Sequence, residues 1–393
     1  MIYTQRLLGV VSLLMVFGFL QKGSKSPMVD AVAMPLSTES RLRTALWGFF
    51  AGDALAMPTH WYYGGFPQVQ RDYGRQGIIG YTKPVTNLGG SILNKSNING
   101  GGRGAFTKTK EGISIIGDVI NHGKREYWDP SKQIHYHATL QKGENTLEVQ
   151  LARVLMKSIV AQGGKFDAQH FREAYMNFMM AKGSHNDTYA STCHRMFFVN
   201  LVLKKLPPDQ CPDNDHHNVD TIDGLVLPTI TALAMASQNL PEEEIANAAA
   251  ATAAVTRNSA QLEGTSRVWS KLVASSLKQE SSLQDDLIEC SKSLGMRRLP
   301  SGNRKDEITA CYLDSSLPST LDMVAKYSSG SVWDGVLANA NVGGENVHRG
   351  SILGAVLGAR STSSDSSKLQ EGLYNEKELQ EEFDAFVHAV LKP

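Results

Sequence analysis

Apolar residues recur every three or four positions along most of the chain, which is the spacing of amphipathic α-helices. Strict apolar–polar alternation, which would predict strands, is nearly absent. The pattern predicts helices at 40–57, 107–121, 144–161, 167–181, 188–206, 221–237, 241–255, 259–278, 283–294, 317–327, 332–339, 346–360 and 376–391. We therefore expect an all-α fold, a compact single-domain bundle of many helices.

Two of the expected helices carry a stripe of small residues. Gly350, Gly354 and Gly358 lie four residues apart in the helix at 346–360, which puts them on one face. Small residues recur at the same interval at positions 48, 52 and 56 of the helix at 40–57. Each glycine costs about 1 kcal/mol relative to alanine in a helix interior. The stripes therefore predict that these two helices pack nearly backbone to backbone.

The N-terminus differs in kind from the rest of the chain. Arg6 precedes an apolar run over 7–20, which is shorter than the ~20 residues of a spanning helix. Ala31-Val32-Ala33 resembles a small-residue cleavage site. We expect residues 1–38 to be a targeting segment and linker, 39–361 the main domain, and 362–393 a polar linker with a C-terminal helix. This segment predicts that the protein is secreted or targeted to an organelle. Translation from Met28 or Met34 would instead give a cytoplasmic product.

The composition of the chain mainly excludes certain classes of partner. The chain has 393 residues, of which 41% are hydrophobic and 20% charged, as in ordinary globular proteins. Lysine plus arginine and aspartate plus glutamate number 39 each, so no net charge favours a nucleic acid or a membrane surface. We expect no nucleic-acid partner and no membrane domain beyond the N-terminal segment. The oligomeric state stays open.

The tripeptide Gly-Glu-Asn occurs twice, at 143–145 and 344–346, each time before a helical pattern. Glu144 and Glu345 are then expected in first helical turns, where free N–H groups and the helix dipole favour anions. Ordinary helix capping explains the same pattern. If the two helix starts converge, the glutamates could act as acid and base or nucleophile on a glycosidic bond, or could bind a divalent metal.

Several further polar side chains lie in loops or at helix starts, where chemistry is common. A lone histidine among them is more often a hydrogen-bonded structural residue than a ligand. The aromatic run at 61–63 could stack a base or pack in the core. The dense Asp/His group between 213 and 223 is expected to be a solvated loop, except for Asp223 at a helix start. The other candidates are Asp53, His60, His135, His137, Asn145, His185, Asp187 and His348.

The segment 48–58, which reads GxxxGDALxxP, resembles the ADP-ribosylglycohydrolase family. Asn341-Val342-Gly343-Gly344 and the glycine-striped helix after it strengthen the resemblance, which spans about 42–359. The family includes the dinitrogenase reductase-activating glycohydrolases and the jellyfish J1 crystallins. The resemblance implies an all-α ADP-ribosylglycohydrolase-like bundle that holds two magnesium ions. It also implies release of ADP-ribose from a modified protein side chain or from a small ADP-ribose derivative.

The residues at the positions of the family's site differ from the family pattern. Glu144-Asn145-Thr146 replaces an acidic pair followed by threonine, and the segment 345–348 replaces Asp-x-Asp-Thr. His60 stands where some members have a glutamate. The implied catalytic residues are Glu345, Glu144 and His60. The implied substrate contacts are Asp53, Trp61, Gly343, Gly344, Asp223 and Arg257, and the implied metal ligands are Glu144, Asn145, Thr146, Glu345 and His348.

Magnesium prefers oxygen ligands in octahedral geometry, whereas histidine suits softer metals. We therefore expect a divalent metal, magnesium by the resemblance, with manganese, another transition metal or no metal as alternatives. Three functions stay open. One is a metal-assisted hydrolase of ADP-ribose or a related nucleotide sugar, the second is a metal-independent glycoside hydrolase that uses both glutamates, and the third is a crystallin-like binding or structural protein.

Overall fold

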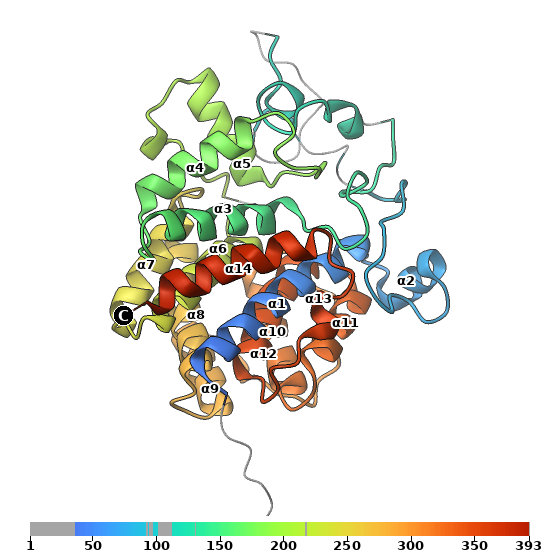
Figure 1. Cartoon of the computed structure of the whole chain (residues 1–393). Coiled ribbons are helices and arrows are strands. Elements are labelled where there is room, and N and C mark those ends of the chain that lie inside the picture. Colours follow the sequence, from blue (N-terminus) through green and yellow to red (C-terminus); the bar gives the residue numbers. More distant parts are fainter. Residues whose placement is uncertain are drawn as a thin grey trace, which may run out of the picture. The chain divides into compact units, whose positions relative to one another are not determined.

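Fourteen α-helices make up most of the computed structural model, which describes residues 36–392 except 92, 94–96, 101–111, 130 and 217 (Figure 1). The expected targeting segment lies outside the described residues. The helices are α1 (Thr38–Ala56), α2 (Gly65–Tyr73), α3 (Leu147–Ala161), α4 (Ala168–Met180), α5 (Thr192–Phe198), α6 (Val226–Ser237), α7 (Glu242–Ala254), α8 (Ala260–Lys278), α9 (Leu283–Ser293), α10 (Leu313–Tyr327), α11 (Val332–Val342), α12 (Val347–Arg360), α13 (Ser367–Gln370) and α14 (Glu376–Leu391). Within the described ranges β-structure is limited to isolated bridges, so the predicted all-α class is confirmed.

Several helices begin at a residue whose side chain caps the first turn. Ser37, Asp167 and Ser259 each accept a hydrogen bond from a backbone N–H three residues on, as N-cap residues do. The predictions at 167–181, 241–255, 259–278 and 376–391 match α4, α7, α8 and α14 to within about two residues.

Three predicted elements are wrong. The helix expected at 107–121 is replaced, where it is described, by an irregular turn in which Ile116 and Gly117 leave the helical region. The helix expected at 188–206 shrinks to α5 followed by a π-turn at Val199–Leu203. The polar linker at 362–372 contains the short helix α13, and α2 was not predicted.

Helix α12 lies against α1 almost backbone to backbone, as the glycine stripes predict (Figure 1). A Cβ atom on Gly52 would lie 2.0 Å from the carbonyl oxygen of Gly350, and one on Gly48 would lie 2.3 Å from that of Gly354. No real side chain tolerates such distances from a backbone. From the first pair to the second, the residue number rises in α12 and falls in α1, so the two helices are antiparallel. The C-terminal end of α1 therefore meets the N-terminal start of α12.

From Leu36 onward the chain forms one compact unit. The C-terminal helix α14 packs on α1 and α3. Phe383 of α14 places its ring 4.6 Å from that of Trp47 and 4.9 Å from that of Phe50 in α1, centroid to centroid. None of the helices in the described part is long and apolar enough to cross a bilayer.

Gly354→Ala tests the backbone contact directly. The added Cβ would lie 2.0 Å from the carbonyl oxygen of Gly48, so α1 and α12 must separate. We expect the free energy of unfolding, measured by urea titration, to fall by at least about 2 kcal/mol.

Gly264→Ala is the matched control, because Gly264 lies within α8 and a Cβ there meets no atom within 4 Å. This change should stabilise the protein by up to about 1 kcal/mol. Equal effects of the two substitutions would contradict the proposed packing.

Candidate active site

The candidate site lies where the end of α1 meets the start of α12. Pro58 lies in a short 3-10 turn after α1, and His60 and Trp61 follow it. Trp61 N–H donates to the carbonyl of Gly344 at 2.8 Å, and Gly344 N–H donates to the carbonyl of Tyr62 at 3.1 Å. This reciprocal pairing joins the two segments.

Gly343 and Gly344, implied as substrate contacts, have a backbone reason for being glycine. Their φ angles are 76° and 65°, a region that favours glycine. A Cβ on Gly343 would lie 2.3 Å from the carbonyl oxygen of Tyr62, and one on Gly344 would lie 2.5 Å from that of Thr309. Both glycines thus permit the close chain approach that forms the site.

Glu345 is the centre of a buried polar cluster. Its Oε2 accepts a hydrogen bond from Trp61 Nε1 at 2.6 Å and lies 3.1 Å from His60 Nε2. Its Oε1 lies 2.7 Å from His348 Nδ1. The residue is 0% exposed, so its carboxylate does not face solvent.

Charge alternates within this cluster. Burial alone would raise the pKa of Glu345, but His60 and His348 hold it well below its usual range. Burial alone would lower the pKa of His348, but the Glu345 carboxylate raises it to about 10. Burial lowers the pKa of His60 to about 4 despite the same carboxylate. The cluster therefore contains a carboxylate, one protonated imidazole and one neutral imidazole.

A third histidine and an aspartate extend the cluster away from Glu345. His60 Nδ1 lies 2.7 Å from His137 Nε2, and His137 Nδ1 lies 2.8 Å from Asp187 Oδ1. Asp187 Oδ2 accepts a hydrogen bond from the N–H of Leu147, the first residue of α3. The sequence offered both residues only as weak candidates, because they lie 50 positions apart and meet through two loops.

The residues of the Glu144 segment form hydrogen bonds with α1 and with two nearby loops. Asp53 accepts hydrogen bonds from Thr146 N–H at 2.8 Å, Thr146 Oγ1 at 2.6 Å and Asn145 Nδ2 at 2.9 Å. Glu144 accepts one from Asn186 Nδ2 and one from the N–H of Gln141, both at 2.7 Å. These residues connect α1 to the start of α3.

The structure corrects the predicted placement of the two glutamates in their helices. Both precede their helices, because α3 begins at Leu147 and α12 begins at Val347, so the first-turn placement is wrong. Among the described residues, Glu144 belongs to no group of three metal-binding side chains, whereas Glu345 does. The side-chain donors of Asn145 and Thr146 are used on Asp53 rather than turned toward Glu345.

Asp223 and Arg257, implied as substrate contacts, bind each other. Arg257 Nη2 lies 2.7 Å from Asp223 Oδ2 and 3.8 Å from Glu148 Oε1. Glu148 Oε1 lies 2.8 Å from His194 Nε2. Neither Glu148 nor His194 was predicted from the sequence, although ionisable residues on apolar helix faces are a usable signal.

Aromatic rings line the region beside Trp61. The ring centroids of Tyr136 and Tyr189 lie 4.4 Å and 5.1 Å from that of Trp61, and both contacts are nearly perpendicular. Trp61 has φ 58°, an unusual angle for a bulky residue, which its bonds to Gly344 and Glu345 maintain. Tyr62 is buried, whereas Tyr63 is 51% exposed and is the ring of the 61–63 run available for stacking on a ligand.

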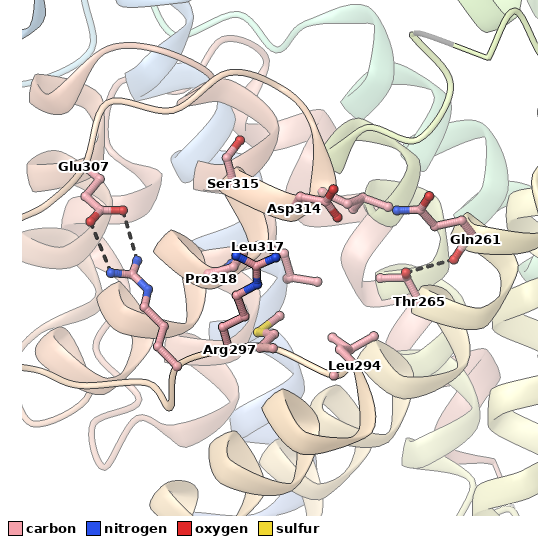
Figure 2. Close-up of a pocket in the computed structure, with 13 residues that line it drawn as sticks. Gln261, Thr265, Leu294, Arg297, Glu307, Asp314, Ser315, Leu317 and Pro318 are labelled. Atoms are coloured by element: carbon pink, nitrogen blue, oxygen red, sulfur yellow. Dashed lines mark hydrogen bonds and ion pairs between the residues drawn. The ribbon is translucent and has the colours of Figure 1, made fainter.

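Two cavities lie elsewhere in the described part. One of about 680 Å³ lies between α8, the segment after α9 and the start of α10, with Arg297, Glu307 and Asp314 around it (Figure 2). A second of about 1110 Å³ includes Phe66 and Ile308. None of the implied site residues lines either cavity.

Sequence comparison assigns the chain to a family. The family model described as ADP-ribosylglycohydrolase matches residues 34–390. The chain belongs to the ADP-ribosylglycohydrolase family. It is thus a member of a family of glycosidic hydrolases, and groups of side chains that could hold a metal ion are present in it.

A solved structure described as "ADP-ribosylglycohydrolase-related protein complex" is similar to this ADP-ribosylglycohydrolase family member. The TM-score is 0.53 at 15% identity, over 90% of this chain and 99% of that chain. At this identity the likeness establishes the fold. A search of curated proteins gives no match.

Asp223→Asn tests the buried ion pair through its pH dependence. Burial alone would raise the pKa of Asp223, but Arg257 holds it well below its usual range. Because that pKa lies below the unfolded value of about 3.9, the stability is present above that pH and is lost as the pH falls through the folded-state pKa. At pH 7 the substitution should lower the free energy of unfolding by about 3–5 kcal/mol.

The gap between wild type and Asp223→Asn should therefore shrink below about pH 4 in urea titrations. Asp384→Asn is the control, since Asp384 pairs with Arg43 at the surface and the change should cost at most about 1 kcal/mol. A gap that is constant with pH would contradict the role given to the pair.

Proposed function

We propose that this chain hydrolyses a glycosidic bond of ADP-ribose or of a related nucleotide sugar, with one divalent transition metal bound by His60, Glu345 and His348. Family membership supports the reaction class. The observation that carries the metal proposal is that ligand atoms of these three side chains lie within 4.8 Å of one another. They do so at the junction of the two segments that carry the family resemblance.

The donor set decides which metal fits. Two of the three side chains offer imidazole nitrogen and only one offers carboxylate oxygen. Magnesium requires near-octahedral oxygen ligands, so the pair of magnesium ions implied by the resemblance does not fit these residues. Zinc, manganese and related ions accept two imidazoles and a carboxylate. When bound, such an ion would supply Lewis-acid polarisation of a substrate oxygen.

The protein's own groups have separate tasks in this proposal. Trp61 Nε1 orients the carboxylate of Glu345 by a 2.6 Å hydrogen bond. The Oε1 atom of the same carboxylate lies 2.7 Å from His348 Nδ1, so Glu345 also orients this second imidazole. Tyr63 offers an exposed ring on which a base or sugar can stack.

The two other functions receive less support from the geometry. A metal-independent mechanism needs two carboxylates on either side of an open bond. The carboxylate of Glu144 accepts hydrogen bonds from Asn186 Nδ2 and from the N–H of Gln141, so both of its oxygens are occupied. A purely structural protein gives no reason for a fully buried carboxylate with two imidazoles beside it, because such a group is costly to bury. Export through the N-terminal segment stays a prediction.

Metal titration with the purified, chelator-treated chain tests the proposal. We expect Mn²⁺ or Zn²⁺ to bind with at least about tenfold higher affinity than Mg²⁺ in calorimetry, because nitrogen ligands favour the former. His60→Ala should reduce that affinity at least about tenfold. Release of ADP-ribose from an ADP-ribosylated protein should require the metal that binds most tightly.

His388→Ala serves as the control, because His388 is exposed on α14 and reports adventitious binding. The metal assignment fails if Mg²⁺ binds best or if His60→Ala and His388→Ala behave alike. The hydrolase assignment fails if no ADP-ribose is released with any of the three metals present.

A further inference from the structure

We infer that Glu148, Cys193 and His194 form a second metal site, whose donor atoms suit Zn²⁺. Ligand atoms of these three side chains lie within 4.8 Å of one another. The site shares no residue with the ligand set proposed above. It goes beyond the proposed function and does not depend on it.

Two helices bring the three side chains together. Glu148 is the second residue of α3, and Cys193 and His194 are the second and third residues of α5. Glu148 is 4% exposed, whereas Cys193 and His194 are 0% exposed. Glu148 Oε1 lies 2.8 Å from His194 Nε2. A carboxylate, a thiol and an imidazole from two separate segments therefore meet in the interior.

The imidazole of His194 is held on both sides. Its Nδ1 lies 2.8 Å from the hydroxyl oxygen of Tyr175, a buried residue of α4, while its Nε2 faces Glu148. Because both nitrogens are engaged, the orientation of the ring is fixed whichever of them carries a proton. Histidine ligands of metals are usually held at their second nitrogen by such an outer partner.

Arg257 is a further charged group beside Glu148, but it is bound to another carboxylate. Its Nη2 lies 2.7 Å from Asp223 Oδ2, and its Nη1 lies 3.2 Å from Asp223 Oδ1. The distance from Nη2 to Glu148 Oε1 is 3.8 Å, which is too long for a hydrogen bond. The charge of Arg257 is thus balanced by Asp223, and the carboxylate of Glu148 is available to a cation.

The donor set favours zinc. Thiolate, imidazole and carboxylate are the three ligand types that bind Zn²⁺ in proteins, and three protein ligands leave a fourth position for water. On binding, the thiol of Cys193 releases its proton to solvent, because the thiolate is the ligand form. Mn²⁺ and Mg²⁺ prefer oxygen ligands. Mn²⁺ should therefore avoid this second site, whereas Zn²⁺ should bind to it.

A zinc ion on these ligands joins α3 to α5. Glu148 lies in the first turn of α3, directly after Thr146 and Leu147, whose N–H groups donate to Asp53 and Asp187. The ion would therefore stabilise the helix start that supports the candidate active site. The alternative is a buried ion pair of Glu148 and His194 without metal, which gives the thiol of Cys193 no role.

Absorption spectroscopy with Co²⁺ on the chelator-treated full chain tests for the thiolate. Co²⁺ can replace Zn²⁺, and only a cysteine ligand gives a thiolate-to-cobalt charge-transfer band in the near ultraviolet. We expect this band in wild type and its loss in Cys193→Ser. A wild type without the band, or a Cys193→Ser chain that keeps it, would overturn the site.

Cys290→Ser is the matched control and should keep the band. Cys290 is also a buried free cysteine within a helix, α9, but it belongs to no group of three metal-binding side chains among the described residues. Urea titration without metal shows whether each variant folds, and Cys193→Ala replaces Cys193→Ser if the latter does not. Loss of the band in both Cys290→Ser and Cys193→Ser would count against the site.

Zinc affinity in a His60→Ala background, which weakens the first site, gives the second readout. Competition with a chromogenic chelator should show that adding Cys193→Ser or Glu148→Gln lowers this affinity more than about 100-fold. The expected loss is this large because even outer-shell groups contribute about 10- to 100-fold. Unchanged affinity in both would leave a buried ion pair only and overturn the site.

Zinc counts after gel filtration separate this site from the proposed function. We expect two bound ions in wild type and one in each of His60→Ala and Cys193→Ser. A single ion that Cys193→Ser removes and His60→Ala retains would support this site and contradict the metal of the proposed function. A single ion that His60→Ala removes and Cys193→Ser retains would overturn this site alone.

Discussion

The glycine contact between α1 and α12 is the constraint on which the rest of the structure depends. Because Gly52 and Gly350 admit no side chain between the two backbones, the helices pack in the register that places these two glycines against each other. That register brings the residues after α1 beside the residues before α12. His60 and Trp61 thus meet Glu345, and the cluster is a geometric consequence of where small residues lie.

The start of α3 provides the second anchor for the site. Asp53 of α1 accepts hydrogen bonds from the side chain and the N–H of the cap residue Thr146. Asp187 accepts one from the N–H of Leu147. One helix start therefore connects the central helix to the histidine chain. Free N–H groups at a helix start favour anionic partners, which explains why two buried carboxylates gather there.

The sequence predicted the parts of this fold that depend on local or repeated signals. Glycine spacing in α1 and α12 predicted their contact, because the absence of a Cβ atom is visible in the sequence itself. Apolar periodicity predicted most helices, because this repeat can also be read directly from the sequence. It failed at Ile116 and Gly117, where an irregular turn buries apolar residues without a helix. Periodicity reports burial, and burial does not require a helix.

The site was predictable only in part. His60, Glu345 and His348 were candidates because they lie in the resembling segments, and these three lie together. Glu144 was paired with Glu345 because the same tripeptide precedes both helices. In the structure Glu144 contacts Asn186 and Gln141, whereas Glu345 contacts Trp61 and two histidines. His137 and Asp187 join the site through contacts between distant loops, which no spacing in the sequence reveals.

In the proposed site, imidazole nitrogen from His60, which follows α1, and from His348 in α12 holds a cation beside Glu345. X-ray absorption at the edge of a bound Mn²⁺ or Zn²⁺ ion measures this ligand set directly. We expect a shell of mixed nitrogen and oxygen with the outer scattering of two imidazole rings. A shell of oxygen alone, without imidazole scattering, would contradict it.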